Sequence, residues 1–301
     1  MVKTYIIIFL LFIGCVRPDN SLHSAKSTQE HSIDKNEDLI FSDEFNYTGL
    51  PDPKKWVFDR GTGPNGWGNW ELQYYTDRDS RNAYVENGLL KIIARRGAVE
   101  NDPYNNYQHY FTSAKISTTC GFKYGRFDIR AKVSSGFGTW PAIWMLPFYR
   151  MKEAWPFSGE IDILEHVGRE PDEVFFTMHS GAFNHLQNNQ LGRHVTGNGD
   201  WEDKFYDYSF EWKKDSMEWF VNGESVHFIQ RQPHWGFFEW PFDRSFSVIT
   251  NLAIGGGFGF IPGTPREYNM PRLNQEIFPK TFEIDYIRVY GNRDNMTCMK
   301  N

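Results

Sequence analysis

Three carboxylates lie close together in a short segment that is otherwise apolar: Glu160, Asp162 and Glu165. Acids in apolar surroundings are costly unless they are paired or used in chemistry. In a regular strand, Glu160 and Asp162 would share one face and Glu165 would point to the other. One extra residue in a β-bulge at Ile163-Leu164 would bring all three acids onto one face. Two carboxylates on one face of a sheet are the groups that glycoside hydrolysis requires.

The same spacing also fits a charged strand edge, but the flanking residues favour a functional site. Gly159 leaves room for a close approach, and the pair Trp155-Pro156 precedes the acids. A second Trp-Pro pair lies upstream at Trp140-Pro141. The chain holds 11 Trp, 15 Tyr and 26 Phe, and aromatic faces suit a cleft that binds sugar rings. We expect most of the Phe side chains to lie in the core instead.

Short alternating segments dominate residues 39–291, without a linker or an internal repeat. Phe127–Val133 alternates strictly between apolar and polar residues, which is typical of a half-buried strand. In Met217–Phe228, Asn222-Gly223 provide the positive φ angles of a type I′ turn, which predicts a hairpin. Helix signals are nearly absent. We therefore predict an all-β, single-domain jelly-roll sandwich of two antiparallel sheets. Further strands are expected over Gly88–Arg95, Phe111–Ser117, Val174–His179, Tyr206–Trp212, Ser245–Ile254 and Thr281–Tyr290.

The amino-terminal residues predict export. Lys3 begins a short positive region, and the apolar run Tyr5–Gly14 is too short to span a membrane stably, so residues 1–14 are expected to be a signal peptide. Cys15 directly follows Gly14, which resembles a bacterial lipobox with cleavage before Cys15 and lipidation of its thiol. Phe12 stands where such a motif usually has Leu, so an ordinary secretory signal is the alternative.

The rest of the chain is expected to divide into three parts. Residues 15–38 are polar and predict a flexible tether, residues 39–293 form the domain, and residues 294–301 are a tail. We expect a lipoprotein at the cell surface or in the periplasm that contacts the membrane only through its lipid, or else a secreted protein. An exported Cys120 and Cys298 could form a disulfide, but their separation gives no spacing signal. Cys and His show no metal-ligand arrangement.

The charge of the chain bears on which partners are to be expected. The formal net charge is −6, which gives no reason to expect a nucleic-acid partner. An acidic protein also argues weakly against a strongly anionic polysaccharide as substrate.

Two segments together carry a family resemblance: Gly159–Glu165 and Thr139–Pro147 closely resemble glycoside hydrolase family 16, in particular its laminarinase-like branch with a bulged active-site strand. The resemblance continues in order along the chain, at Phe41–Phe45, Trp67–Tyr75, Asn251–Gly256 and Glu283–Tyr290. It implies a concanavalin-like jelly roll whose concave face forms an open cleft for a β-glucan chain.

The resemblance also implies roles for the acids. Glu160 would be the nucleophile that forms a covalent glycosyl-enzyme, and Glu165 would be the general acid and then the general base. This retaining chemistry needs carboxyl groups about 5–5.5 Å apart. Ionised Glu160 would raise the pKa of Glu165 by repulsion until Glu160 is esterified. Asp162 would hydrogen-bond Glu160 and tune its charge, although it could be a plain structural acid.

Substrate-binding and metal-binding residues follow from the same resemblance. The cleft would be lined by Asn69, Trp140, Trp144, His179, Asn251 and Lys115. Each of the two Trp could instead be core, Asn69 a loop cap and His179 a structural histidine. Lys115 stands where many relatives carry Arg, and Lys lacks the bidentate fork, so its contact with sugar is open. Catalysis needs no cofactor, but some members hold a structural calcium, for which Glu44 and Asp285 are candidates; both are equally explained as exposed strand acids.

The resulting functional prediction is a monomeric, retaining endo-hydrolase of β-1,3-glucan or mixed-linkage β-1,3/1,4-glucan. Two alternatives stay open: a β-galactan hydrolase of the agarase or carrageenase type, and a non-catalytic surface protein that binds glycans. The segment Trp140–Met145 favours glucan over galactan, and the intact acids at 160, 162 and 165 favour an enzyme over a binder.

Overall fold

The computed structural model describes residues 38–97, 110–149, 152, 154–197 and 199–299. The expected signal peptide, the lipidation site Cys15 and the tether up to residue 37 lie outside these residues. Within the described ranges, no helix is both long and apolar enough to cross a membrane.

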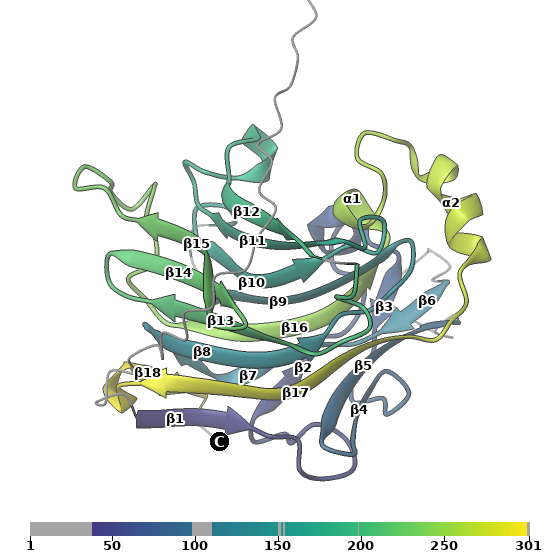
Figure 1. The fold of residues 1–301 in the computed structure, drawn as a ribbon, viewed down its shortest axis with the longest axis horizontal. Helices are drawn as coiled ribbons and strands as arrows, with labels where there is room; N and C mark the ends of the chain where they lie inside the picture. Colours follow the sequence, from purple (N-terminus) through teal and green to yellow (C-terminus); the bar gives the residue numbers. More distant parts are fainter. Residues whose placement is uncertain (1–37, 98–109, 150–151, 153, 198, 300–301) are drawn as a thin grey trace, which may run out of the picture. The chain divides into compact units, whose positions relative to one another are not determined.

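Ten strands of the described chain form one sheet, in the order β15-β14-β13-β8-β17-β5-β6-β3, with β1 beside β17 and β4 beside β5 (Figure 1). The β3–β6 pair at one edge of this sheet is parallel, and the other pairs of the described strands are antiparallel, as predicted. The strands are β1 (Asp38–Asp43), β3 (Gln73–Tyr75), β4 (Ala83–Glu86), β5 (Leu89–Arg96), β6 (Phe111–Ser113), β8 (Gly125–Lys132), β13 (Tyr206–Trp212), β14 (Ser216–Val221), β15 (Glu224–Gln230) and β17 (Lys280–Gly291).

Eight described strands form the second sheet, in the order β12-β11-β10-β9-β16-β7-β18, with β2 beside β7. They are β2 (Trp56–Phe58), β7 (Lys115–Phe122), β9 (Thr139–Pro147), β10 (Glu160–His166), β11 (Glu173–His179), β12 (Leu191–Thr196), β16 (Phe246–Ile254) and β18 (Met296–Cys298). Strand β18 pairs with β7, and Cys298 forms a disulfide with Cys120. The expected domain boundary at residue 293 therefore falls before the last strand. The disulfide and the pairing of β18 with β7 join the expected tail to the sheet.

The hydrophobic core lies between the inner faces of the two sheets, as the alternating patterns predict. Phe127, Ile129 and Ala131 of β8 are fully buried in it, together with Ile143 and Ile161 of the opposite sheet. Burial of apolar surface on both inner faces is the main force that joins two sheets into a sandwich. The predicted all-β sandwich is confirmed.

Most predicted strands are present, and the hairpin is confirmed. Asn222 and Gly223 have φ angles of 49° and 81° and join β14 to β15. The expected strand over Phe111–Ser117 is in fact two strands, because the chain crosses from one sheet to the other at Ala114. The buried Ser113 hydroxyl donates to the Leu252 carbonyl oxygen (2.7 Å) beside this crossing.

Helices are few in the described chain, but one was not predicted. Helix α2 (Arg266–Gln275) contains Pro271 and buries only Asn269 and Leu273, so it lacks the apolar periodicity that announces a helix. It follows the short α1 (Gly256–Gly259) and precedes β17 (Figure 1). Short single-turn segments cover Gly66–Trp70, His185–Gln187 and Arg293–Asn295.

Candidate active site

The irregular strand β10 places the three acids. Asp162 pairs with Thr177 and Glu165 with Phe175, so Ile163 and Leu164 together face one residue of β11. The ladder to β9 shifts at the same place. Ile163 and Leu164 both bury their side chains in the core, which holds the extra residue in position. The predicted bulge is confirmed, and Glu160, Asp162 and Glu165 line one cleft.

This cleft has a volume of about 470 Å³ and lies on the face of the eight-stranded sheet that points away from the core. Five of the six expected substrate-binding residues line it: Asn69, Lys115, Trp140, Trp144 and Asn251. His179 lies behind it against Asp162, where its Nε2 is 3.4 Å from Asp162 Oδ2. Residues that were not predicted also line it: Trp67, Gly68, Glu71, Tyr75, Ala142, Leu146, Trp155, His185 and Leu186.

Burial dominates the electrostatics of the acids. The pKa of Glu160, Asp162 and Glu165 is raised to about 8 in each case, mainly by loss of water. Repulsion from Asp162 is part of this rise for both glutamates, and repulsion from Glu165 is part of it for Glu160. Three carboxyl groups on one face cannot all ionise cheaply, so the cluster holds both protonated and ionised acids near neutral pH.

Hydrogen bonds distinguish the two glutamates. The Trp140 indole N–H donates to Glu165 Oε1 (2.9 Å), which opposes the rise in the pKa of Glu165. Asp162 makes no hydrogen bond to Glu160 among the described residues, and its Oδ2 is buried without a hydrogen-bond partner there. The expected Asp162–Glu160 hydrogen bond is thus not formed in this structure, where Asp162 Oδ2 instead lies 3.4 Å from His179 Nε2.

One wall of the cleft is a chain of hydrogen bonds. The Trp144 indole N–H donates to Asn251 Oδ1 (2.7 Å), and Asn251 Nδ2 donates to the Tyr75 hydroxyl oxygen (3.1 Å). The Tyr75 hydroxyl in turn donates to Glu71 Oε2 (3.2 Å). Asn69 Nδ2 also donates to Glu71, at 3.1 Å. Burial raises the pKa of Glu71, which accepts hydrogen bonds from two cleft-lining side chains, Asn69 and Tyr75.

Lys115 packs between aromatic rings of this wall. Its Nζ lies 4.2 Å from the centre of the Trp67 ring and 5.0 Å from that of Trp144. Asp59 Oδ2 is 3.4 Å from the same nitrogen. The ammonium group of Lys115 thus contacts two indole rings and one carboxylate. Its main contacts are therefore with protein groups around the cleft.

Trp155 and His185 border the cleft beside His179. Their ring centres lie 4.9 Å apart, and the His185 ring is 5.4 Å from that of His179. Burial lowers the pKa of His185, so its ring is neutral at neutral pH. Trp155 was noticed as part of a Trp-Pro pair, whereas His185 comes from a loop without any sequence signal.

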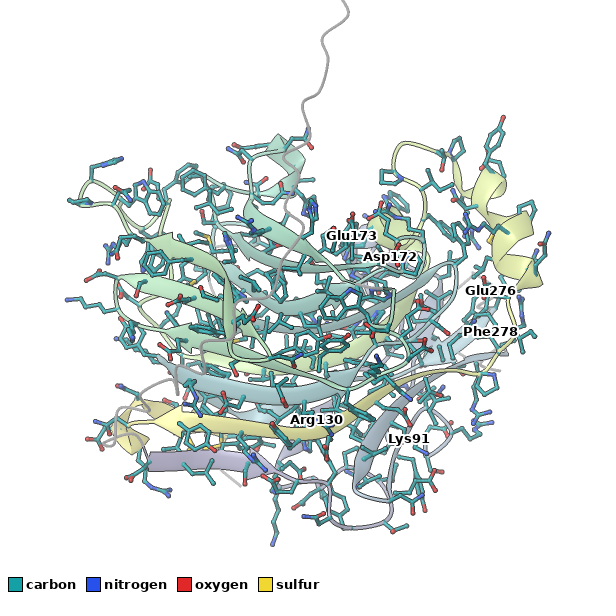
Figure 2. The ribbon with its side chains drawn as sticks, in the orientation of Figure 1. Lys91, Arg130, Asp172, Glu173, Glu276 and Phe278 are labelled. Atoms are coloured by element: carbon teal, nitrogen blue, oxygen red, sulfur yellow. A yellow bond between two sulfur atoms is a disulfide. The ribbon has the colours of Figure 1, made fainter. Side chains whose placement is uncertain are left out.

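The two acids proposed for calcium do not fit a shared cation site. Both carboxylate oxygens of Glu44 accept hydrogen bonds from Arg288, at 2.8 and 2.6 Å. Asp285 Oδ2 accepts one from Arg130 (2.6 Å), whose position on β8 is labelled in Figure 2. Guanidinium groups at both acids would repel a cation. The one close group of three potential ligands among the described residues is Glu160, Asp162 and His179, that is, two acids of the cleft and the histidine that faces Asp162.

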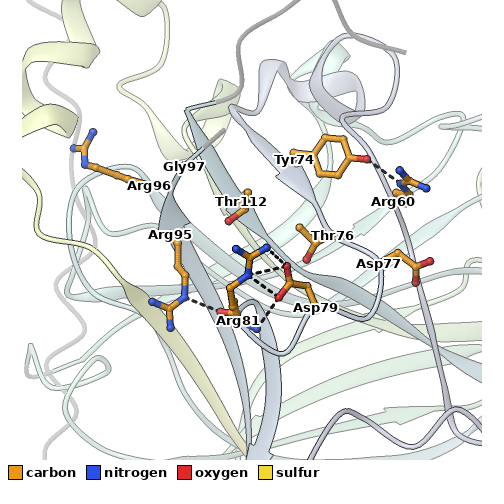
Figure 3. Close-up of a pocket in the computed structure, with 10 residues that line it drawn as sticks. All are labelled: Arg60, Tyr74, Thr76, Asp77, Asp79, Arg81, Arg95, Arg96, Gly97 and Thr112. Carbon is orange, nitrogen blue, oxygen red and sulfur yellow. Dashed lines mark hydrogen bonds and ion pairs between the residues drawn. The ribbon is translucent and has the colours of Figure 1, made fainter. Parts of the chain in front are cut away.

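A second cavity, of about 660 Å³, lies beside β3, β5 and β6 and shares no lining residue with the cleft (Figure 3). Its lining is polar and includes four arginines, Arg60, Arg81, Arg95 and Arg96. Asp79 pairs with Arg81, and Arg96 donates to the Leu273 carbonyl oxygen (2.9 Å). The arginines are thus held by neighbours, and the cavity contains none of the predicted site residues.

Comparison with known proteins agrees with this site. The family model "Glycosyl hydrolases family 16" matches residues 71–264. The chain is 42% identical over 264 residues to a beta-glucanase of Rhodothermus marinus, covering 84% of this chain and 85% of the relative. It is 36% identical over 260 residues to a glucan endo-1,3-beta-glucosidase of Cryptopygus antarcticus, covering 83% and 90%. The solved structure of the Rhodothermus marinus laminarinase matches with a TM-score of 0.74 at 41% identity, covering 85% of this chain and 97% of that one.

Proposed function

The chain belongs to glycosyl hydrolase family 16, and from this membership and the site we propose that it is an endo-acting hydrolase of β-1,3-glucan or mixed-linkage β-1,3/1,4-glucan. The observation that carries the proposal is the bulge in β10, which puts Glu160 and Glu165 in one cleft. The matched relatives are themselves described as glucanases, which supports glucan as the substrate class.

In the first step, the Glu160 carboxylate attacks the anomeric carbon of the bound sugar while Glu165 protonates the glycosidic oxygen. The bond between those two substrate atoms breaks, and a glycosyl ester forms on Glu160. Burial and repulsion from Asp162 raise the pKa of Glu165, so its proton is available at neutral pH. The pKa of Glu160 is raised as far, so the cluster reacts in the form in which Glu160 has ionised, and that charge keeps the neighbouring acids protonated. Trp140 orients the acid by its bond to Oε1.

In the second step, water attacks the same carbon and Glu165 takes a proton from it. The ester bond breaks, Glu160 leaves as a carboxylate and the product keeps the β configuration. Esterified Glu160 carries no charge, so its repulsion of Glu165 ends and the pKa of Glu165 falls. This change lets one carboxyl act as acid first and base second. The steps use only carboxyl groups and water, so activity should survive exhaustive treatment with a chelator.

The variant Glu160→Ala tests the enzymatic role. We expect it to lose turnover of laminarin by at least about a thousandfold, as loss of a catalytic group generally does, while still binding the polymer. A pure glycan-binding protein would bind equally well with either residue and would release no sugar. Proton NMR of the first product should show the β anomer, and an α anomer would overturn the assignment of Glu160 as nucleophile.

Substrate class is tested by digesting laminarin, mixed-linkage β-glucan and agarose side by side and sizing the products. We expect long oligosaccharides first from both glucans, since an open cleft admits internal linkages. Release of oligosaccharides from agarose alone would favour the galactan hydrolase instead.

We also propose that the protein is exported as a lipoprotein attached through Cys15 and acts as a monomer. The apolar run before Cys15 supports export. The Cys120–Cys298 disulfide supports an oxidising compartment. Mass spectrometry of the amino-terminal peptide and membrane fractionation of a Cys15→Ser variant test the anchor. Recovery of the variant in the soluble fraction, while the wild-type protein is in the membrane fraction, would support the anchor. The same distribution of both proteins between the two fractions would contradict it. Light scattering tests the monomer.

A further inference from the structure

Trp70 is an exposed aromatic residue at the end of the segment Gly66–Trp70, which supplies Trp67, Gly68 and Asn69 to the cleft. About 70% of its surface is accessible, although its chain neighbours Asn69 and Glu71 both line the cleft. A single exposed aromatic residue is ordinary on a protein surface. Trp70 differs from such a residue in its backbone conformation and in the hydrogen bonds that hold its neighbours.

The backbone at Trp70 has a left-handed conformation. Its φ angle is 62°, and Asn65 and Trp67 in the same loop have φ angles of 51° and 57°. A bulky side chain rarely adopts this region, because its Cβ crowds the following carbonyl group. Such strain persists only where surrounding structure imposes it, and it gathers at ligand-binding segments.

The loop that carries Trp70 is held at both ends. The backbone N–H groups of Trp70 and Glu71 donate to the carbonyl oxygens of Asn65 (2.9 Å) and Gly66 (3.2 Å), and that of Leu72 donates to Ile254 (2.8 Å). Glu71 accepts further hydrogen bonds from Asn69 and from Gln73, the latter at 2.6 Å. The side chains on either side of Trp70 are thereby fixed toward the cleft, while its own ring stays in solvent.

We propose that Trp70 forms a further sugar-binding subsite at the rim of the cleft, where its indole stacks on a pyranose ring of a bound β-glucan chain. This rests on the proposed glucanase function. An indole offers a broad apolar face to the C–H face of a sugar, and its N–H adds a donor for a hydroxyl group. The rigid loop holds the ring in place before binding, which reduces the ordering cost of association. Only a chain long enough to reach from the acids to the rim can use this contact.

The variant Trp70→Ala, assayed against laminarin and a series of β-1,3-gluco-oligosaccharides, tests the subsite. We expect KM for laminarin to rise about threefold to tenfold, the size of one lost aromatic contact, with kcat within about twofold. The shortest oligosaccharides cleaved should keep their wild-type kcat/KM, and the loss should appear above one threshold length. Trp70→Phe should recover part of the affinity. Tyr268→Ala is the matched control, since Tyr268 is 75% exposed on α2 and does not line the cleft.

Two results would overturn the subsite. An unchanged KM for laminarin in Trp70→Ala, at unchanged thermal stability, would mean that the ring contacts no substrate. An equal loss for short and long substrates would mean that Trp70 only supports the loop. Failure of the proposed function looks different, because the wild-type protein would then cleave none of these glucans.

Discussion

The indole N–H of Trp219 donates a 2.9 Å hydrogen bond to the backbone carbonyl oxygen of Asp162, although the two residues belong to different sheets. Trp219 lies fully buried in β14, and Asp162 begins the bulge of β10. A bulge interrupts the ladder between neighbouring strands. The core of the sandwich thus supplies a fixed donor at the irregularity that places Glu160 and Glu165 together.

Trp219→Phe should lower catalysis more than its loss of stability explains. It keeps an aromatic ring in the core but leaves the Asp162 carbonyl without this donor. We expect a loss of about 1–3 kcal/mol in the free energy of unfolding and a fall in kcat of about tenfold, with less change in KM. Trp212→Phe is the matched control, because Trp212 is also fully buried and its indole N–H has no hydrogen-bond partner among the described residues. Equal effects on kcat in the two variants would contradict a role in positioning.

Trp140→Phe should move the alkaline limb of the kcat/KM profile to higher pH. The Trp140 hydrogen bond favours ionised Glu165 and so lowers the pKa of that acid against the rise caused by burial. Without it, Glu165 keeps its proton longer, and we expect a shift of about one pH unit. Trp144→Phe is the control, since the Trp144 indole donates to Asn251 and not to an acid. If both variants keep the wild-type limb, another group sets it.

Glu160→Gln should stabilise the protein above the ordinary pKa range of glutamate. Burial raises the pKa of Glu160 to about 8, so between about pH 4.5 and 8 the unfolded chain releases this proton first and folding stability falls as the pH rises. Glutamine avoids that loss. Because Glu160 is only half-buried, we expect a gain on the order of 2 kcal/mol at pH 8 and none at pH 4.

Melting temperatures of both proteins from pH 4 to 9 measure this gain. Glu44→Gln should behave in the opposite way, because Arg288 lowers the pKa of Glu44 and its contribution is lost as the pH falls. A gain for Glu160→Gln that is the same at every pH would contradict the electrostatic cause.

Lys115→Met should weaken substrate binding without removing catalysis. The substitution keeps the length of the side chain but removes the cation that contacts the rings of Trp67 and Trp144. We expect KM for laminarin to rise about threefold and stability to fall by about 1–2 kcal/mol, with kcat nearly unchanged. Lys123→Met removes a comparable contact with Tyr124, which does not line the cleft. A large fall in kcat for Lys115→Met would show that this lysine acts on the reacting groups.

Reduction of the Cys120–Cys298 disulfide should lower stability and leave the chemistry intact. The crosslink spans 178 residues, and closing so long a loop is worth about 2–5 kcal/mol. Three strands of the described sheet, β9, β16 and β7, separate β18 from β10. Denaturant titration with and without reductant measures the loss, and Cys298→Ser should show no further response to reductant. If reduction also lowered kcat at a temperature where both forms are folded, the disulfide and the active site would not be independent of each other.

Local chemistry made much of the fold predictable. Alternation in Phe127–Val133 and the Asn222-Gly223 turn depend on neighbouring residues alone, and the structure confirms both. The crossing at Ala114 and helix α2 were missed because both depend on distant partners. Ser113 bonds Leu252 across the crossing, and α2 buries too little apolar surface to leave a periodic pattern.

The site divides in the same way. Spacing predicted that Glu160, Asp162 and Glu165 need a bulge to share a face, because strand geometry has a period of two residues. Which groups surround those acids depends on the tertiary structure. His179 at Asp162, Trp140 at Glu165 and Trp219 behind the bulge come from three other strands. Sequence alone therefore determined which acids could react, and only folding decided which is oriented by an indole, which faces a histidine and how far burial raises each pKa, since burial and hydrogen bonding are properties of the assembled sheets.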